Sequence, residues 1–282
     1  MINTGKLVGK TVFITGASRG IGEAIAIKCG KDGANIVIAA KTSAPHPKLP
    51  GTIHTAAEKI EKAGGKALPC VVDIRDENQI KNAVEEAIKQ FGGIDIVVNN
   101  ASAIDLSGTS ELQMKKYDLM HNINCRGTFL VSKICLPHLK KSQHAHILNI
   151  SPPIRTKPMW FSSHVAYTIA KLGMSMCVLG MSEEFKKYGI SVNALWPKID
   201  IQTAALDLLT NKQGAKIARK PDIMADAAYS IFLQDPKLPG TSGNFYVDED
   251  LLRDNGVKDF DQYCMDPAYK NQLLKDFFAH NL

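Results

Sequence analysis

Short apolar runs rich in β-branched residues alternate with helical patterns along most of this chain. The strand-like runs lie at residues 11–15, 34–40, 67–73, 94–100, 146–151, 190–197 and 243–248. Helical patterns lie between them, among others at 21–33, 77–92 and 165–189. Strands that are apolar throughout and separated by helices are typical of a parallel sheet covered by helices on both faces. The alternation therefore predicts an α/β fold with a doubly wound parallel sheet of about seven strands.

Two segments depart from this alternation. Residues 42–52, TSAPHPKLPGT, contain three prolines and are predicted to form a loop after the second strand. The tail from about Asp250 is charged and has little β pattern. We therefore expect one domain over residues 1–250, and an extension over 251–282 that either packs on the core or is a linker.

Composition excludes several classes of protein. Of the 282 residues, 45% are hydrophobic and 22% are charged, as in an ordinary globular protein. No apolar run reaches the length of a membrane span, and the first apolar segment is too short for a signal peptide. The formal charge of +6 is dispersed, so no nucleic-acid partner is expected. The six cysteines are scattered without a CxxC pair, which indicates free thiols in a reducing, intracellular compartment. His144 and His146 have no third ligand in the pattern, so we expect surface histidines and no metal site.

A glycine-rich turn, TGASRGIG at 15–22, follows the first strand and opens the first helix. Gly16 permits a tight turn, Gly20 lets the backbone approach a pyrophosphate, and Gly22 lets helix and strand pack closely. The start of the helix offers unpaired N–H groups to phosphate. This context predicts a dinucleotide site in a Rossmann-type fold.

The end of the second strand indicates which dinucleotide binds. An acidic residue there would hold the ribose 2′-hydroxyl of NAD, but the strand ends Ala39, Ala40, Lys41. Arg19, inside the glycine turn, offers a second cation. Two converging cations and no repelling carboxylate favour NADP(H).

Together with NNAS at 99–102 and Tyr167-x-x-x-Lys171, the glycine turn makes the chain resemble the short-chain dehydrogenase/reductase family over about residues 8–250. A departure is Ser102, where the family pattern usually has glycine. The resemblance implies cofactor contacts from the following residues: Gly16, Ala17, Ser18, Arg19, Gly20, Ile21, Gly22, Lys41, Asp73, Asn99, Ala101, Tyr167, Lys171 and Ile199.

Longer runs resemble one subgroup of that family more closely: AAKTSAPHPKLPGT, ILNISPPI and VNALWPK. In that subgroup a sterol-carrier-like domain follows the dehydrogenase domain. We expect that this chain either lacks such a module or has been cut before it.

Tyr167 and Lys171 are four residues apart in a helical pattern and share one helix face. Bringing a tyrosine pKa from about 10 to near 7 requires about 4 kcal/mol of preference for the phenolate. A nearby ammonium supplies such a preference, so Tyr167 is predicted to be the general acid or base. By the resemblance, Lys171 also holds the nicotinamide ribose, and Asn124 supports a water-linked proton relay.

The family serine is missing from its usual place. Aligned on the fifth strand, its position is Pro152, and Ser151 precedes it. Successive strand residues point to opposite faces, so Ser151 substitutes only if the proline pair at 152–153 turns the chain. Three possibilities stay open: Ser151, Ser162 or Ser163 replaces the hydroxyl; the enzyme works slowly without it; or the domain binds NADP without efficient turnover.

The predicted function is NADP-dependent hydride transfer to or from a carbonyl or hydroxyl of a small lipophilic substrate, fatty or steroid-like. The alternatives are reduction of an enoyl- or dienoyl-CoA, and an NADP-binding scaffold of lipid metabolism. Residues 199–220 would form a substrate lid, with Leu206, Leu208 and Leu209 as lining or as helix core. By resemblance, the chain is expected to be a homodimer or homotetramer in the peroxisome or mitochondrion, the cytosol being possible.

Overall fold

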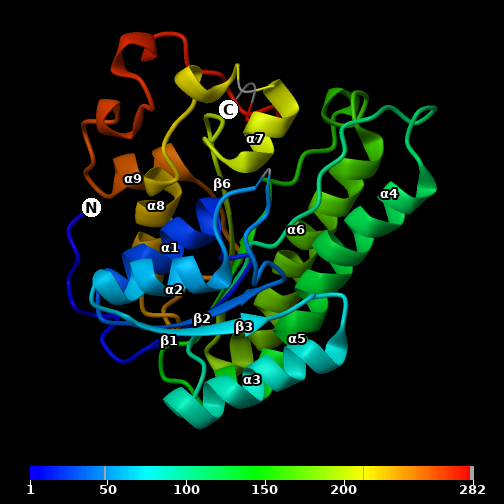
Figure 1. Ribbon diagram of the computed structural model, residues 1–282. Coiled ribbons are helices and arrows are strands. Elements are labelled where there is room, and N and C mark those ends of the chain that lie inside the picture. Colours follow the sequence, from blue (N-terminus) through cyan, green and yellow to red (C-terminus); the bar gives the residue numbers. More distant parts are fainter. Residues whose placement is uncertain (48, 212, 280–282) are drawn as a thin grey trace.

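A seven-stranded parallel sheet forms the centre of the molecule (Figure 1). The computed structural model describes residues 1–47, 49–211 and 213–279. The strands are β1 (Thr11–Thr15), β2 (Asn35–Ala40), β3 (Lys66–Val71), β4 (Ile96–Asn99), β5 (His146–Ile150), β6 (Ser191–Trp196) and β7 (Phe245–Val247). Their order in the sheet is β3-β2-β1-β4-β5-β6-β7, and every pair is parallel. The predicted doubly wound α/β fold is confirmed.

Helices cover both faces of the sheet. They are α1 (Gly20–Lys31), α2 (Ile53–Lys62), α3 (Glu77–Phe91), α4 (Met114–Met120), α5 (Thr128–Leu139), α6 (Val165–Phe185), α7 (Ala204–Thr210), α8 (Asp222–Phe232) and α9 (Asp248–Asp254). A π-helical stretch, His121–Gly127, joins α4 to α5. In Figure 1, α1, α2 and α8 lie on one side of the sheet, and α3, α5 and α6 lie on the other.

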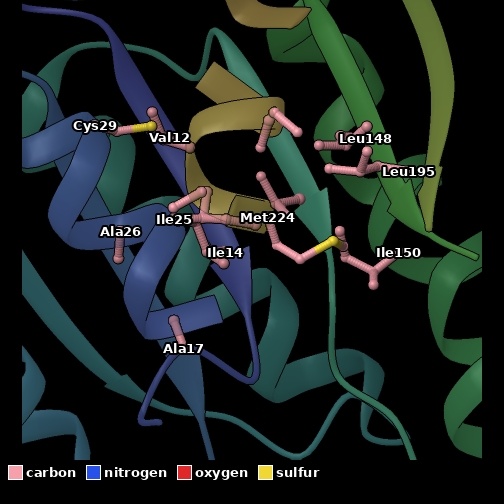
Figure 2. Close-up of a cluster of buried hydrophobic side chains, with 14 of the residues drawn as sticks. Val12, Ile14, Ala17, Ile25, Ala26, Cys29, Leu148, Ile150, Leu195 and Met224 are labelled. Carbon is pink, nitrogen blue, oxygen red and sulfur yellow. The ribbon is translucent and has the colours of Figure 1, made fainter. Parts of the chain in front are cut away.

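The two faces of the central strands β1, β2, β4, β5 and β6 contribute to two separate hydrophobic cores. Val12 and Ile14 pack with Ile25 of α1 and Met224 of α8, whereas Phe13 packs on the opposite face with α3 and α5. Figure 2 shows the first of these clusters. Because both faces are buried, the strand residues are apolar throughout, which is why the sequence shows runs instead of alternation.

A glycine lies just past the end of three predicted helices, either directly after the helix or after the short turn that follows it. Gly33, Gly92 and Gly189 have φ of +87°, +84° and +66°, a region that favours glycine. These positions set the short returns from helix to strand that the sheet topology requires.

Two details differ from the sequence-based expectation. His146 lies on β5 and is 1% exposed, so it is a buried residue and not a surface one. Burial, with the neighbouring His144 acting in the same direction, lowers its pKa to about 3. Helix α6 with the turn after it is long and apolar enough to cross a membrane by length and composition. However, 56% of its most apolar window is buried inside the protein, as in a core helix.

Candidate active site

The glycine turn connects β1 to α1 at the point where the strand order reverses between β1 and β4. Gly16 and Gly20 have φ of +68° and +62°. A Cβ on Gly16 would lie 2.9 Å from Ala101 Cα, and one on Gly22 would lie 2.4 Å from Asn100 Nδ2. No larger residue fits these positions unless the backbone or the Asn100 amide moves, so the turn forms a cradle of backbone atoms at a helix start.

A cavity of about 470 Å³ lies along this turn and the ends of β2, β3 and β4. Eight of the predicted cofactor residues line it: Gly16, Ser18, Arg19, Gly20, Ile21, Lys41, Asp73 and Ala101. Backbone N–H groups at a helix start, a cationic edge and an elongated cavity suit the phosphates and ribose of a dinucleotide. The residues present therefore fit a nicotinamide dinucleotide.

Ala17, Gly22, Asn99 and Ile199 do not line this cavity. Ala17 is fully buried beneath the turn, and Gly22 acts by allowing close packing. Ile199 is 7% exposed and pairs with Lys275 of the C-terminal segment. This pairing with a distant segment directs Ile199 away from the cavity. The local sequence pattern around Ile199 does not predict the pairing.

Asn99 and Asn100 have different roles from those expected. The Asn99 amide donates to Ser132 Oγ at 3.0 Å and to Asn149 Oδ1 at 2.8 Å, inside the core. The Asn100 amide instead donates to the carbonyl oxygens of Thr15 at 2.9 Å and Gly16 at 3.2 Å. Asn100 therefore holds the glycine turn in place, and the doubled asparagine in NNAS was the signal for it.

The cationic edge of the cavity is held by hydrogen bonds and ion pairs. Arg19 donates to Pro50 O at 2.7 Å and to Thr42 Oγ1 at 3.0 Å, which ties the proline-rich loop to the turn. Lys41 is 58% exposed along its side chain and lies 3.5 Å from a carboxylate oxygen of Asp73. A side-chain hydrogen bond from Arg75 lowers the Asp73 pKa to about 2, so this carboxylate is ionised at neutral pH.

Tyr167 and Lys171 line a second cavity of about 210 Å³ that shares Ile21, Asn100 and Ser102 with the first. Both side chains project from α6 and are almost fully buried. Lys171 Nζ donates to Ile150 O at 2.6 Å. Burial lowers the Lys171 pKa to about 7. Burial also raises the Tyr167 pKa, with the charge of Asp276 acting in the same direction and a hydrogen bond with Ser102 opposing it.

The C-terminal segment reaches this cavity, which the sequence did not indicate. Asp276 and Phe277 line it, and the Phe277 ring centroid is 6.0 Å from that of Tyr167. Asp276 Oδ1 accepts hydrogen bonds from Trp196 Nε1 at 2.7 Å and from Phe278 N at 2.8 Å. In Figure 1 the red end of the described chain, up to residue 279, lies beside α7. Two adjacent phenylalanines in a charged tail were the available signal for burial.

Asn124 and Ser151 lie outside the residues that line the cavity. Asn124 is in the π-helical stretch, and its amide binds both backbone polar groups of Ala103, at 2.9 and 3.0 Å. Ser151 is fully buried, and its N–H donates to Asn149 O at 2.9 Å. Within the described residues its hydroxyl has no hydrogen-bond partner. The strand ends at Ile150, before the proline pair, and the Ser151 hydroxyl does not line the cavity.

Helix α7 forms one wall of both cavities. Leu206 is 8% exposed and lines the smaller cavity together with Leu209. Leu208 is 64% exposed and lies at the larger one. Of the two interpretations of these leucines, lining is the one that the structure supports.

Comparison with known proteins agrees with this geometry. The sequence profile of the short chain dehydrogenases matches residues 10–213. The chain is 63% identical over 276 residues to hydroxysteroid dehydrogenase-like protein 2 of Danio rerio, and also to that of Homo sapiens. The alignments cover 98% of this chain but 65% of each relative, so the chain spans about two thirds of the length of these relatives.

Solved structures show the same similarity. A short chain dehydrogenase from Mycobacterium thermoresistibile is 47% identical, with a TM-score of 0.91 and coverage of 98% of this chain and 96% of that one. The family match, the glycine turn after β1 and the Tyr167–Lys171 pair in the adjoining cavity agree with one another. The chain therefore belongs to the short-chain dehydrogenase/reductase family, oxidoreductases that use NAD(H) or NADP(H).

Proposed function

We propose that this protein is an NADP(H)-dependent oxidoreductase that interconverts a carbonyl and a hydroxyl on a small lipophilic substrate. The observation that carries the proposal is the meeting of two cavities at Ser102 and Asn100. One cavity is shaped for a dinucleotide and the other contains a buried tyrosine and lysine. When bound, the dinucleotide supplies or accepts a hydride at this junction.

The preference for NADP(H) is supported by the end of β2. Lys41 and Arg19 both line the larger cavity, and the residues before Lys41 are the alanines 39 and 40. A 2′-phosphate there would replace Asp73 as the partner of Lys41, and Arg19 would add a second cation. NAD(H) offers only a hydroxyl at that position and gains nothing from either cation.

Tyr167 is proposed to transfer the proton. Burial keeps its phenol protonated, which suits donation to a carbonyl oxygen that becomes negative as the carbon accepts hydride. The Lys171 ammonium, one helical turn away, stabilises the resulting phenolate electrostatically. Asn124 contributes by holding the loop after β4 through Ala103, so it is a positioning residue.

The substrate is proposed to be lipophilic because the smaller cavity has an apolar wall. Ile104, Ile201, Leu206, Leu209 and Phe277 contribute to that wall from three separate parts of the chain. A polar substrate would leave its hydrogen-bonding groups unpaired against these side chains. A fatty or steroid-like carbonyl compound fits the wall, in line with the names of the relatives.

The exposed apolar side chains of α5 and α6 support self-association. Phe129, Ile169, Met176 and Leu179 are 42–52% exposed on these two helices. Met174 and Met181, on the same long helix, are buried and belong to the core. We propose that α5 and α6 form a homodimer or homotetramer contact, to be tested by sedimentation velocity.

A second candidate is an NADP-binding scaffold with little turnover. It is favoured by Pro152, which has no hydroxyl, together with the burial of the Ser151 hydroxyl away from the cavity. The two candidates agree on cofactor binding and differ only in chemistry.

Two measurements test the proposal. NADPH and NADH are titrated while cofactor fluorescence is recorded, and Arg19→Ala with Lys41→Ala should weaken NADPH binding about 10–100-fold with little change for NADH. Absence of NADPH binding would rule out both candidates.

Tyr167→Phe should abolish reduction across a panel of medium-chain ketones, 3-ketosteroids and 9,10-phenanthrenequinone. Tyr188→Phe, which removes the hydroxyl of an exposed tyrosine after α6, is the matched control. Equal turnover in both variants would refute the enzyme proposal.

A further inference from the structure

The geometry identifies which hydroxyl faces Tyr167 in place of the missing serine. Ser151 is fully buried and does not line the cavity that contains Tyr167. Ser162 and Ser163 are exposed and do not line it either. The three serines that the sequence suggested are therefore placed away from the reacting position.

Unlike those three serines, Ser102 lies at the cavity that contains Tyr167. It follows β4 and lines both the dinucleotide cavity and the Tyr167 cavity. Ser102 and Tyr167 line the same cavity, and the Ser102 side chain acts to lower the Tyr167 pKa against the effect of burial. The other contact of the Ser102 hydroxyl, to Ala103 O, is 3.5 Å long and therefore weak. This weak contact does not hold the hydroxyl away from a ligand.

The backbone on both sides of Ser102 is held rigidly. Before it, the N–H groups of Asn100 and Ala101 both donate to Thr15 Oγ1 at 3.0 Å. After it, Asn124 binds the N–H and the carbonyl of Ala103. Asn124 is fully buried, so this clamp is shielded from water. A serine between two fixed residues has its hydroxyl presented in a narrow range of positions, which is what a preorganised donor requires.

We propose that Ser102 is a catalytic residue that donates the hydrogen bond to the reacting oxygen and to Tyr167, in place of the serine whose position is occupied by Pro152. This assignment rests on the proposed function. In the reduction, the carbonyl carbon gains the hydride and the C=O electron pair moves to oxygen. That oxygen takes the Tyr167 proton, leaving a phenolate. Ser102 keeps its own proton throughout and only donates a hydrogen bond, and the dinucleotide is the species oxidised.

The assignment also gives the departure at position 102 a chemical meaning. A glycine there offers no side chain, and a serine at 152 would supply the donor from β5. In this chain the serine and the non-hydroxyl residue are exchanged between the loop after β4 and the loop after β5, and of the two positions only Ser102 lines the cavity. The donor therefore approaches from the end of β4 and not from the end of β5.

The first test needs no substrate. In the NADP⁺ complex, the absorbance of tyrosinate is titrated against pH, and Tyr167→Phe identifies the contribution of Tyr167. Ser102→Ala should raise the Tyr167 pKa by about half a unit to one unit, since one hydrogen bond to a phenolate is lost. Ser110→Ala, in the exposed loop before α4, should leave it unchanged. Equal Tyr167 pKa values in Ser102→Ala and wild type would overturn the assignment.

The second test uses turnover of 9,10-phenanthrenequinone with NADPH. Ser102→Ala should lower kcat about 10²-fold, a larger factor than its effect on the NADPH dissociation constant, and Ser102→Thr should restore part of kcat. A loss of kcat in Ser151→Ala but not in Ser102→Ala would assign the role to Ser151 and refute the proposal. If Tyr167→Phe also leaves turnover intact, the proposed function is refuted. If Tyr167→Phe abolishes turnover but Ser102→Ala leaves kcat unchanged, the proposed function stands and the assignment of Ser102 is refuted.

Discussion

Asp276 should make the stability of this protein depend on pH in a direction opposite to that of most carboxylates. It is 6% exposed and lies between Trp196 and the Tyr167 cavity. Burial raises its pKa to about 7, with Asp200 and Asp248 adding to the effect, although hydrogen bonds from Trp196 and Phe278 oppose it. Between pH 3.8 and about 7, Asp276 is therefore mostly protonated in the folded protein and mostly ionised in the unfolded chain.

The sign and size of the effect follow from this difference. Because the folded pKa is raised above the unfolded value of 3.8, the free energy of unfolding falls as pH rises between those two values. From about pH 5 to the folded pKa is roughly two units at about 1.4 kcal/mol each, so the loss is on the order of 3 kcal/mol. Asp276→Asn keeps an oxygen that can accept from Trp196 and Phe278 but has no proton to lose.

Urea unfolding of both proteins at about pH 5 and about pH 9 measures this directly. The stability of Asp276→Asn relative to wild type should rise by about 3 kcal/mol from the lower pH to the higher one. Lys171 is mostly neutral at the higher pH, because burial lowers its pKa to about 7, so the loss of its charge partner costs little there. Asp254→Asn, at the exposed end of α9, is the matched control and should behave alike at both pH values. A relative stability that does not rise between the two pH values would refute the argument.

Two further perturbations test the cofactor turn and the core. Gly22→Ala places a methyl group 2.4 Å from Asn100 Nδ2, so it should displace the amide that holds the turn and weaken NADPH binding at least about tenfold, measured by fluorescence titration. Unchanged affinity would show that the turn adapts. Asp226→Asn removes a carboxylate that accepts from Lys28 at 2.8 Å and from Tyr263 at 2.7 Å, and should cost about 1–3 kcal/mol at neutral pH. Burial opposes ionisation there, but these hydrogen bonds lower the Asp226 pKa overall, so the difference from wild type should shrink as pH falls through it. A difference that does not shrink on acidification would contradict this cause.

The arrangement of the main elements could be predicted because it depends on local periodicity. Strands buried on both faces are apolar throughout, and helices between them force parallel crossovers. The glycine turn could be placed because Gly16 and Gly20 need positive φ, which few other residues tolerate. Tyr167 and Lys171 could be paired because a spacing of four on a helix puts them on one face.

The choice between neighbouring residues could not be made in this way. Asn99 and Asn100 have the same side chain, and only the twist at the end of β4 directs one into the core and the other to the glycine turn. The same holds for the serines, since the orientation of a hydroxyl at a strand end depends on how the following loop packs. Pattern can propose such residues, but it does not decide among them.

By itself, the sequence determined the parallel sheet, the dinucleotide turn and the helix that carries Tyr167 and Lys171, because each of these depends on residues close together in the chain. Only the tertiary structure decided that Ser102 and Asp276 line the same cavity as Tyr167. Those contacts join the loop after β4, the middle of α6 and the last residues described. They arise from the packing of distant segments around one cavity, so the local periodicity of apolar residues does not predict them.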